Sequence, residues 1–160
     1  MKAIRKNANS PLVLDDVDRK ILRLLAIQAD RSYSDLSELV HLSPPAIHER
    51  IKRMRLKGVI LSTVAKLDGG KIGCPLLAFI HVKTGGLPMT EPILALQELA
   101  DVEEIHTAAG DTSLILKVRC ADSKGLEKLL SRIQEISGVR STYCYVTLST
   151  YLERGPMPEK

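Results

Sequence analysis

The residues best suited to a binding task are the cations gathered between positions 50 and 57. Five of these eight residues are lysine or arginine. Cations at helical spacing can neutralise the phosphates of a nucleic acid, which makes binding strongly dependent on salt. The excess of positive charge also lies in the first part of the chain. Residues 1–60 hold 12 Lys or Arg against 7 Asp or Glu, whereas residues 61–160 hold 11 against 12. A surface that meets a polyanion is therefore expected in the first sixty residues.

A helix over residues 44–57 would position these cations. Ile47, Ile51 and Met54 are spaced i, i+4 and i+7, which predicts one buried face. Ser43 is expected to cap this helix, with Pro44 at its first position, where a missing N–H is harmless. The first turns of such a helix meet base edges, and the later cations reach phosphates. The predicted DNA contacts are Ser43, Pro44, Pro45, Ala46, His48, Glu49, Arg50, Lys52, Arg53 and Arg55.

Two alternatives stay open for this helix. A basic helix can simply form the solvated face of a three-helix bundle. Arg50 lies about 60° from the buried stripe of an ideal helix, so its guanidinium could bind a phosphate or pair with an acid of a preceding helix.

Two helices are predicted before the basic one, the second of them short. Asp15 and Asp18 have the spacing of a capping box at the start of the first helix, as do Ser32 and Asp35 at the start of the second. His41 is expected in the exit turn, because histidine tolerates the left-handed conformation better than most residues do. Short helices joined by a tight turn, the last of them cationic, predict a helix-turn-helix DNA-binding domain over residues 14–61. A flexible basic tail is expected at residues 1–13, and the β-rich stretch that follows the domain predicts a wing or linker strand at residues 62–73.

The remaining residues have the pattern of a second domain. The expected elements are strand 76–84, helix 90–100, strand 102–109, strand 113–120, helix 122–137 and strand 139–150. Equivalent points in the two halves are 37 residues apart, which indicates a repeated βαβ unit. We therefore predict a ferredoxin-like βαββαβ domain over residues 74–152, a C-terminal tail at 153–160, and an α+β fold class overall. Because residues 76–80 are apolar on both sides of their strand, a second subunit is expected to cover the open face of the sheet, giving a homodimer.

Catalysis, metal binding and membrane insertion are not expected. The chain has no GxSxG, P-loop or GxGxxG pattern, so no nucleophile or nucleotide site is marked. Its scattered cysteines, Cys74, Cys120 and Cys144, form no CxxC pair, which favours a reducing cytoplasm and no metal or other cofactor. No apolar run approaches the ~18 residues that a membrane span needs. Aromatic residues make up 3% of the chain, too few for binding single strands by base stacking.

With both halves in place, the sequence resembles the Lrp/AsnC family of leucine-responsive, or feast/famine, regulators over about residues 12–152. The resemblance is carried by LDDVDRKIL at 14–22, LSPPAIHERIKRM at 42–54, GVI at 58–60, and Gly110-Asp111 between the two middle strands. Each piece alone is weak, whereas their order and spacing together are specific. The resemblance implies a winged helix-turn-helix domain, a ligand-sensing βαββαβ domain, dimers that join into octamers, and control of operons tied to amino-acid metabolism.

The resemblance also implies a site for an amino-acid-like effector between subunits, with the Gly110-Asp111 loop on one side. The predicted effector contacts are His106, Thr107, Gly110, Asp111, Thr112, Ser113, Thr147 and Ser149. Family members commonly continue this loop with a second Asp and a Tyr, where this chain has Thr112, Ser113 and Leu114. Asp111 is therefore the local carboxylate that could pair with an ammonium group. An effector-independent or architectural DNA-binding protein of the same fold stays open as the alternative.

Overall fold

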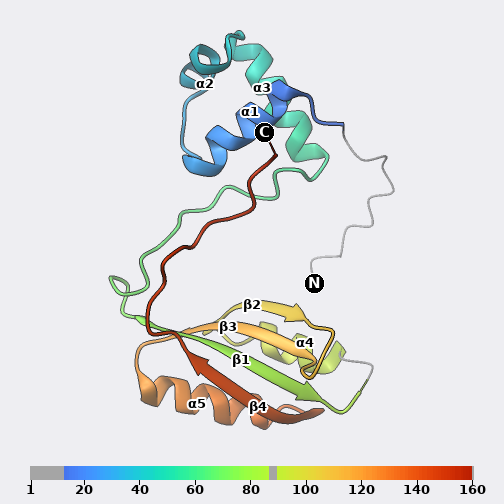
Figure 1. Cartoon of the computed structure of the whole chain (residues 1–160), viewed down its shortest axis with the longest axis vertical. Helices are drawn as coiled ribbons and strands as arrows, with labels where there is room; N and C mark the ends of the chain where they lie inside the picture. Colours follow the sequence, from blue (N-terminus) through green and yellow to red (C-terminus); the bar gives the residue numbers. More distant parts are fainter. Residues whose placement is uncertain (1–12, 87–89, 160) are drawn as a thin grey trace. The chain divides into compact units, whose positions relative to one another are not determined.

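The computed structural model describes residues 13–86 and 90–159, which divide into two compact units. The helical unit comprises the residues up to Ala65 together with those from Glu153 onwards, and the sheet unit comprises Lys66–Leu152 (Figure 1). The predicted N-terminal tail lies outside the described residues, apart from Val13, which is exposed. Within the described ranges, no helix is both long and apolar enough to cross a membrane.

The helical unit contains α1 (Asp16–Ile27), α2 (Tyr33–Val40) and α3 (Pro44–Leu56). Both predicted capping boxes are formed at the starts of α1 and α2. His41 ends α2 with φ 58°, as predicted. Ser43 differs from the prediction, because it occupies the N-cap position of α3 but its side chain makes no capping hydrogen bond. Pro45, at the second position of α3, has no N–H for the serine to accept, and the serine does not bond the N–H of Ala46 at the third position.

The three helices meet in a small aliphatic core. α3 contributes the stripe that its periodicity predicted, and this stripe shares one buried cluster with side chains of α1 and α2. The buried side chains of this cluster are Ile21, Leu36, Val40, Ile47, Ile51 and Met54. Burial of these side chains fixes which face of α3 is turned to solvent.

The wing or linker strand expected at residues 62–73 is not formed. Residues 61–68 are neither helix nor strand, and residues 69–73 form a turn. A strand requires a neighbouring strand to bond its backbone groups, and the described part of the chain provides none here. The turn is closed by Asp68, whose carboxylate accepts from the N–H of Gly70 at 2.9 Å. Leu61 and Val64 are left exposed.

The sheet unit contains β1 (Leu76–Thr84), α4 (Thr90–Gln97), β2 (Val102–Thr107), β3 (Leu114–Cys120), α5 (Ser123–Gln134) and β4 (Val139–Val146). This order confirms the predicted βαββαβ fold. The sheet is antiparallel, and its strands lie in the order β2-β3-β1-β4. β4 ends at Val146 rather than at residue 150. Val146 lies opposite Ala78, and only two residues of β1 precede Ala78, so the last residues of the predicted strand have no strand to pair with.

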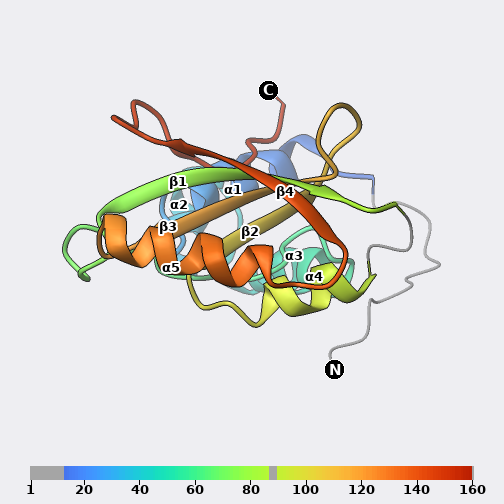
Figure 2. The same cartoon turned by 90° about the horizontal axis from the view of Figure 1, so that it is seen from below.

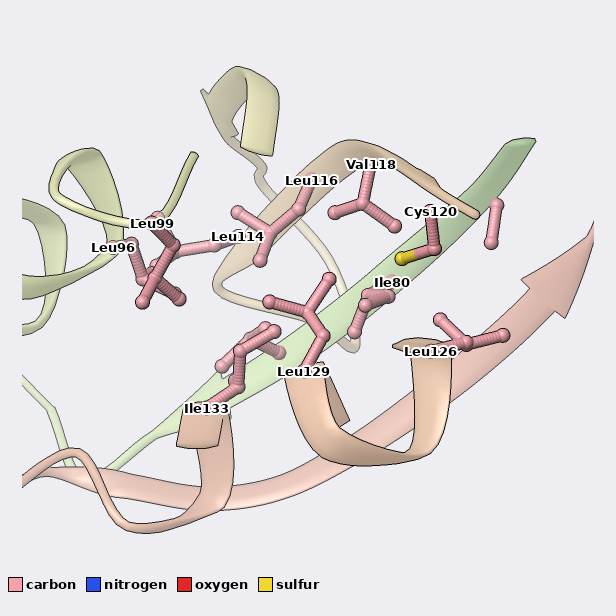
Figure 3. Packing of buried hydrophobic residues seen from close by; sticks show 12 residues of the cluster. Ile80, Leu96, Leu99, Leu114, Leu116, Val118, Cys120, Leu126, Leu129 and Ile133 are labelled. Atoms are coloured by element: carbon pink, nitrogen blue, oxygen red, sulfur yellow. The ribbon is translucent and has the colours of Figure 1, made fainter. Parts of the chain in front are cut away.

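Both helices cover the same face of this sheet (Figures 1 and 2). Alternate side chains of β1 and β3 point from the sheet into the space against α4 and α5, as Figure 3 shows. The buried cluster consists of Ala78, Ile80, Val82, Leu96, Leu99, Leu114, Leu116, Val118, Cys120, Leu126, Leu129 and Ile133. Burial raises the pKa of the Cys120 thiol to about 11, so this cysteine stays protonated and serves as a small apolar core residue.

The opposite face of the sheet is of mixed character. Phe79 of β1 and Tyr143 and Tyr145 of β4 are exposed on it. Phe79 pairs directly with Tyr145 in the register of the two strands. Helices cover only the other face of this antiparallel sheet. The aromatic patch therefore leaves apolar area in contact with water.

Candidate functional site

The turn between α2 and α3 fixes how α3 is presented. The N–H of Leu42 donates to the carbonyl of Ser37 at 3.2 Å, and the hydroxyl of Ser37 donates back to the carbonyl of Leu42. Leu36 and Val40 of α2 share the core with Ile47 of α3. The two helices therefore form the compact pair joined by a tight turn that the sequence predicts.

The exposed face of α3 carries small and polar residues in its first turns. Pro45 and Glu49 are exposed. The Glu49 carboxylate lies 3.4 Å from Nδ1 of His48 and 3.8 Å from Nζ of Lys52. The ring of His48 packs edge-on against Tyr33, with 5.4 Å between centroids. These predicted contacts therefore share one solvent-facing surface, with Ala46 half-buried beside them.

Two of the cations predicted to hold phosphates, Arg50 and Arg53, form ion pairs with acids at the start of α1. Nη1 of Arg50 lies 2.6 Å from Asp15 and 2.8 Å from Asp18, and Nη2 of Arg53 lies 2.6 Å from Asp18. The hydrogen bond from Arg50 is the main reason that the pKa of Asp15 lies below its usual range. For Arg50, pairing with an acid of a preceding helix is one of the two roles that the sequence left open. For Arg53, whose partner is 35 residues away, no local pattern indicated the pair.

Arg55 borders a groove that the sequence did not predict. The groove has a volume of about 1000 Å³, and its walls come from α1, from residues 59–64 and from tail residues 155–158. The tail is also held by Arg23, whose Nη1 donates to the carbonyl of Glu159 at 2.7 Å. The proline-rich tail has no periodicity from which its packing could have been inferred.

The loop between β2 and β3 holds four of the predicted effector contacts. Gly110 has φ 149°, in the region that favours glycine. The hydroxyl of Thr112 donates to a carbonyl of β1 at 3.0 Å, and the hydroxyl of Ser113 accepts from a backbone N–H of the same strand at 3.1 Å. Both hydroxyls therefore fasten the loop to the end of β1. Asp111 is exposed.

The other predicted effector contacts do not gather around this loop. His106, on the open face of the sheet, lies 2.9 Å from Glu104, and this hydrogen bond is the main cause of the lowered pKa of Glu104. Thr107 ends β2 beside the loop and is exposed. Thr147 and Ser149 follow β4 at the opposite end of β1, where the N–H of Thr147 donates to the carbonyl of Leu77. One chain therefore does not bring the two groups together.

The open face beside His106 carries a cross-strand charge network. A bulge interrupts the β2–β3 register between Val102 and Glu104. The carboxylate of Glu103 lies 3.2 Å from Nζ of Lys117 and 2.5 Å from Nε of Arg119. No group of three or more His, Cys, Asp or Glu side chains that could hold a metal ion occurs in the part of the chain that the structure describes.

Two family models match these two units. The AsnC-type helix-turn-helix domain matches residues 14–55, and the Lrp/AsnC ligand binding domain matches residues 77–157. The chain belongs to the Lrp/AsnC family. The proteins of this family are transcriptional regulators and not enzymes, which confirms the class predicted from the sequence.

Two relatives that are transcriptional regulators match nearly the whole chain. The HTH-type transcriptional regulator FL11 of Pyrococcus horikoshii is 31% identical over 147 residues, which cover 92% of this chain and 97% of the relative. The leucine-responsive regulatory protein of Haemophilus influenzae is 35% identical over 152 residues, which cover 92% and 90%. This Lrp/AsnC chain is thus a DNA-binding transcriptional regulator.

Solved Lrp/AsnC structures have the same architecture. E. coli AsnC is 26% identical and superposes with a TM-score of 0.84, covering 92% of this chain and all of that one. A feast or famine regulatory protein from M. tuberculosis complexed with L-methionine is 32% identical, with a TM-score of 0.85, covering 91% of this chain and all of that one. The α+β fold predicted for this Lrp/AsnC member is therefore confirmed.

Proposed function

We propose that this Lrp/AsnC regulator acts in the cytoplasm as a homodimer, which assembles further up to an octamer, and binds a degenerate palindromic operator. The observation that carries the proposal is the presentation of α3, whose apolar stripe is locked in the core while its first turns and Lys52 face solvent. Two such helices on a two-fold dimer would enter successive major grooves about one helical turn apart.

The side chains of α3 divide by their place along the helix. Pro45, Ala46, His48 and Glu49 would contact or exclude base edges, with Ser43 and Pro44 at the entry to the helix. Lys52 and Arg55, which are exposed and come later in the helix, would hold phosphates.

Replacing Lys52 and Arg55 by glutamine should make operator binding weaker and less dependent on salt. Each phosphate that a cation no longer neutralises makes the slope of log K against log salt shallower by roughly 0.9, and the two changes act on both protomers of a dimer. Titration of a labelled duplex by fluorescence anisotropy over a range of salt concentrations measures this slope. The paired change Lys124→Gln and Lys128→Gln, on exposed positions of α5, is the control and should leave the slope unchanged. Equal slopes for the two variants would contradict the proposal.

The open face of the sheet supports assembly through the sheet unit. Its aromatic patch lies along β1 and β4, and its charge network lies along β2 and β3. A second copy of the sheet would remove the aromatic area from water and leave the ionic pairs at a polar rim, which is the composition of a stable interface.

An amino-acid-like metabolite is the effector that we propose. The relative complexed with L-methionine is 32% identical to this chain along nearly its whole length. The exposed carboxylate of Asp111 would pair with the ammonium group of the ligand, beside Gly110, Thr107 and His106. Thr112 and Ser113 would shape the loop, and Thr147 and Ser149 would come from a second subunit. A ligand held between subunits changes DNA binding by favouring one assembly over another.

Replacing Asp111 by asparagine should weaken the binding of the effector about 10-fold or more, since a hydrogen bond to a charged group contributes about 1.5–3 kcal/mol. Thermal-shift measurements with L-methionine and each other common amino acid identify the ligand, and calorimetry gives its affinity. Glu98→Gln, at an exposed acid that follows α4, is the matched control. If no amino acid altered the melting temperature, the assembly or operator binding, the effector-independent alternative would hold.

A further inference from the structure

We infer that Asp18 is the positioning residue of the DNA-reading helix. Its buried carboxylate holds Arg50 and Arg53 at the start of α1 and thereby fixes the fine rotation of α3 toward the duplex, within the orientation that the buried stripe of α3 sets. The two arginines then position α3, and Lys52 binds phosphates of the DNA. This inference rests on the proposed reading of DNA by α3.

The contact is made at two points. The Asp18 side chain is 0% exposed, and each of its oxygens receives a different guanidinium. Oδ1 accepts from Arg50 at 2.8 Å, and Oδ2 accepts from Arg53 at 2.6 Å. Since residues three apart lie on neighbouring turns of one helix side, the pair of contacts resists rotation of α3 about its own axis. A single contact would add less to the resistance that the buried stripe already gives.

Asp18 is itself fixed by the first turn of α1. Its N–H donates to Oδ1 of Asp15 at 2.7 Å, in the capping box that begins the helix. The second oxygen of Asp15 accepts from Arg50 at 2.6 Å. A carboxylate in the first turn of a helix is also stabilised by the positive helix end. The same residues therefore start α1 and hold α3.

This arrangement gives the cations of α3 different roles in DNA binding. The charges of Arg50 and Arg53 are balanced by carboxylates at hydrogen-bond distance, so few counterions are released when DNA approaches them. Lys52 is 3.8 Å from the exposed Glu49, a weak i,i+3 pair. The side chain of Arg53 is 45% exposed, close to the 57% of Lys52. Exposure alone therefore does not distinguish a positioning role from a phosphate contact, whereas the binding experiments below do.

The first test is Asp18→Asn in the full-length chain. The probes are a duplex that the wild-type protein selects from a random pool and an unselected duplex of the same length. Removing a negative charge should by itself tighten binding to any DNA. Positioning predicts the opposite for the selected duplex, with binding weaker by at least about 10-fold, while binding to the unselected duplex is unchanged or tighter. A selected-to-unselected ratio within about threefold of wild type would overturn the inference.

The second test compares Arg53→Gln with its neighbour Lys52→Gln, because both changes remove one exposed cation from α3. Lys52→Gln should make the salt slope shallower by about 0.9 per protomer and leave the ratio unchanged. Arg53→Gln should lower the ratio and leave the slope unchanged. A shallower slope with an unchanged ratio for Arg53→Gln would identify a phosphate contact and overturn the inference.

Helical content measured by circular dichroism accompanies each variant. If Asp18→Asn loses the helical signal, the comparison of Arg53→Gln with Lys52→Gln decides alone. Failure of the proposed function has a different signature, since the wild-type protein itself would then show no preference for the selected duplex.

Discussion

The paired change Phe79→Asp and Tyr145→Asp should keep the proposed homodimer from forming and weaken operator binding by a factor of about 10²–10⁴. The two side chains are 38% and 58% exposed and lie directly opposite each other on β1 and β4. The two new carboxylates would have to lose their hydration when this surface is buried on assembly. No positive charge of the partner would compensate for that desolvation energy. A monomer presents one α3 in place of two and loses the gain in affinity that comes from binding both half-sites together.

Sedimentation velocity measures the assembly, and anisotropy with the operator duplex measures the affinity. Leu94→Asp is the control, because Leu94 is an exposed apolar residue of α4, on the helix-covered side of the sheet. This variant should sediment as the wild-type protein does. Wild-type sedimentation of the double variant would show that the open face is not the interface.

Met54→Ala should unfold the helical unit and leave the sheet unit folded. Met54 is 0% exposed within the buried cluster of the helical unit, and truncating a buried methionine to alanine costs about 2–5 kcal/mol. A core of this size rarely supplies more than about 3–5 kcal/mol of net stability, so most of it would be lost. DNA binding should fall with the folded fraction of the helical unit, while the oligomeric state is kept.

Urea denaturation followed by circular dichroism tests this prediction, together with sedimentation of the variant in the absence of urea. Leu56→Ala, two residues further along α3 at 72% exposure, is the matched control and should shift the midpoint little. A Met54→Ala variant with the wild-type midpoint would show that the cluster does not support the helical unit as described.

Local patterns in the sequence predicted the elements of both units well. The spacing of Asp15 with Asp18 and of Ser32 with Asp35 predicted where α1 and α2 begin, and both capping boxes are present. The apolar stripe of α3 predicted its buried face. Such patterns depend only on residues within a few positions of each other, so they do not require knowledge of tertiary contacts.

The partners of polar side chains could not be predicted in the same way. Arg53 reaches Asp18 only because α1 and α3 cross with those residues adjacent, and periodicity does not specify the crossing. The same limit applies to Thr112 and Ser113, whose hydroxyls bond backbone groups of β1. The strand expected at residues 62–73 failed for a related reason: β-propensity identifies a segment able to pair, but not the partner that it needs.

The tail at residues 153–159 has a mechanical consequence. Because it packs with the helical unit while Lys66–Leu152 forms the sheet unit, the polypeptide passes between the two units twice. A body attached by one connection can turn about it, whereas a second connection, held by the noncovalent packing of the tail, closes a ring that restricts torsion. A torsion of the sheet unit relative to the helical unit would thus be resisted by two connecting segments. Cleaving the chain at one of these segments would lower that resistance and leave both units intact.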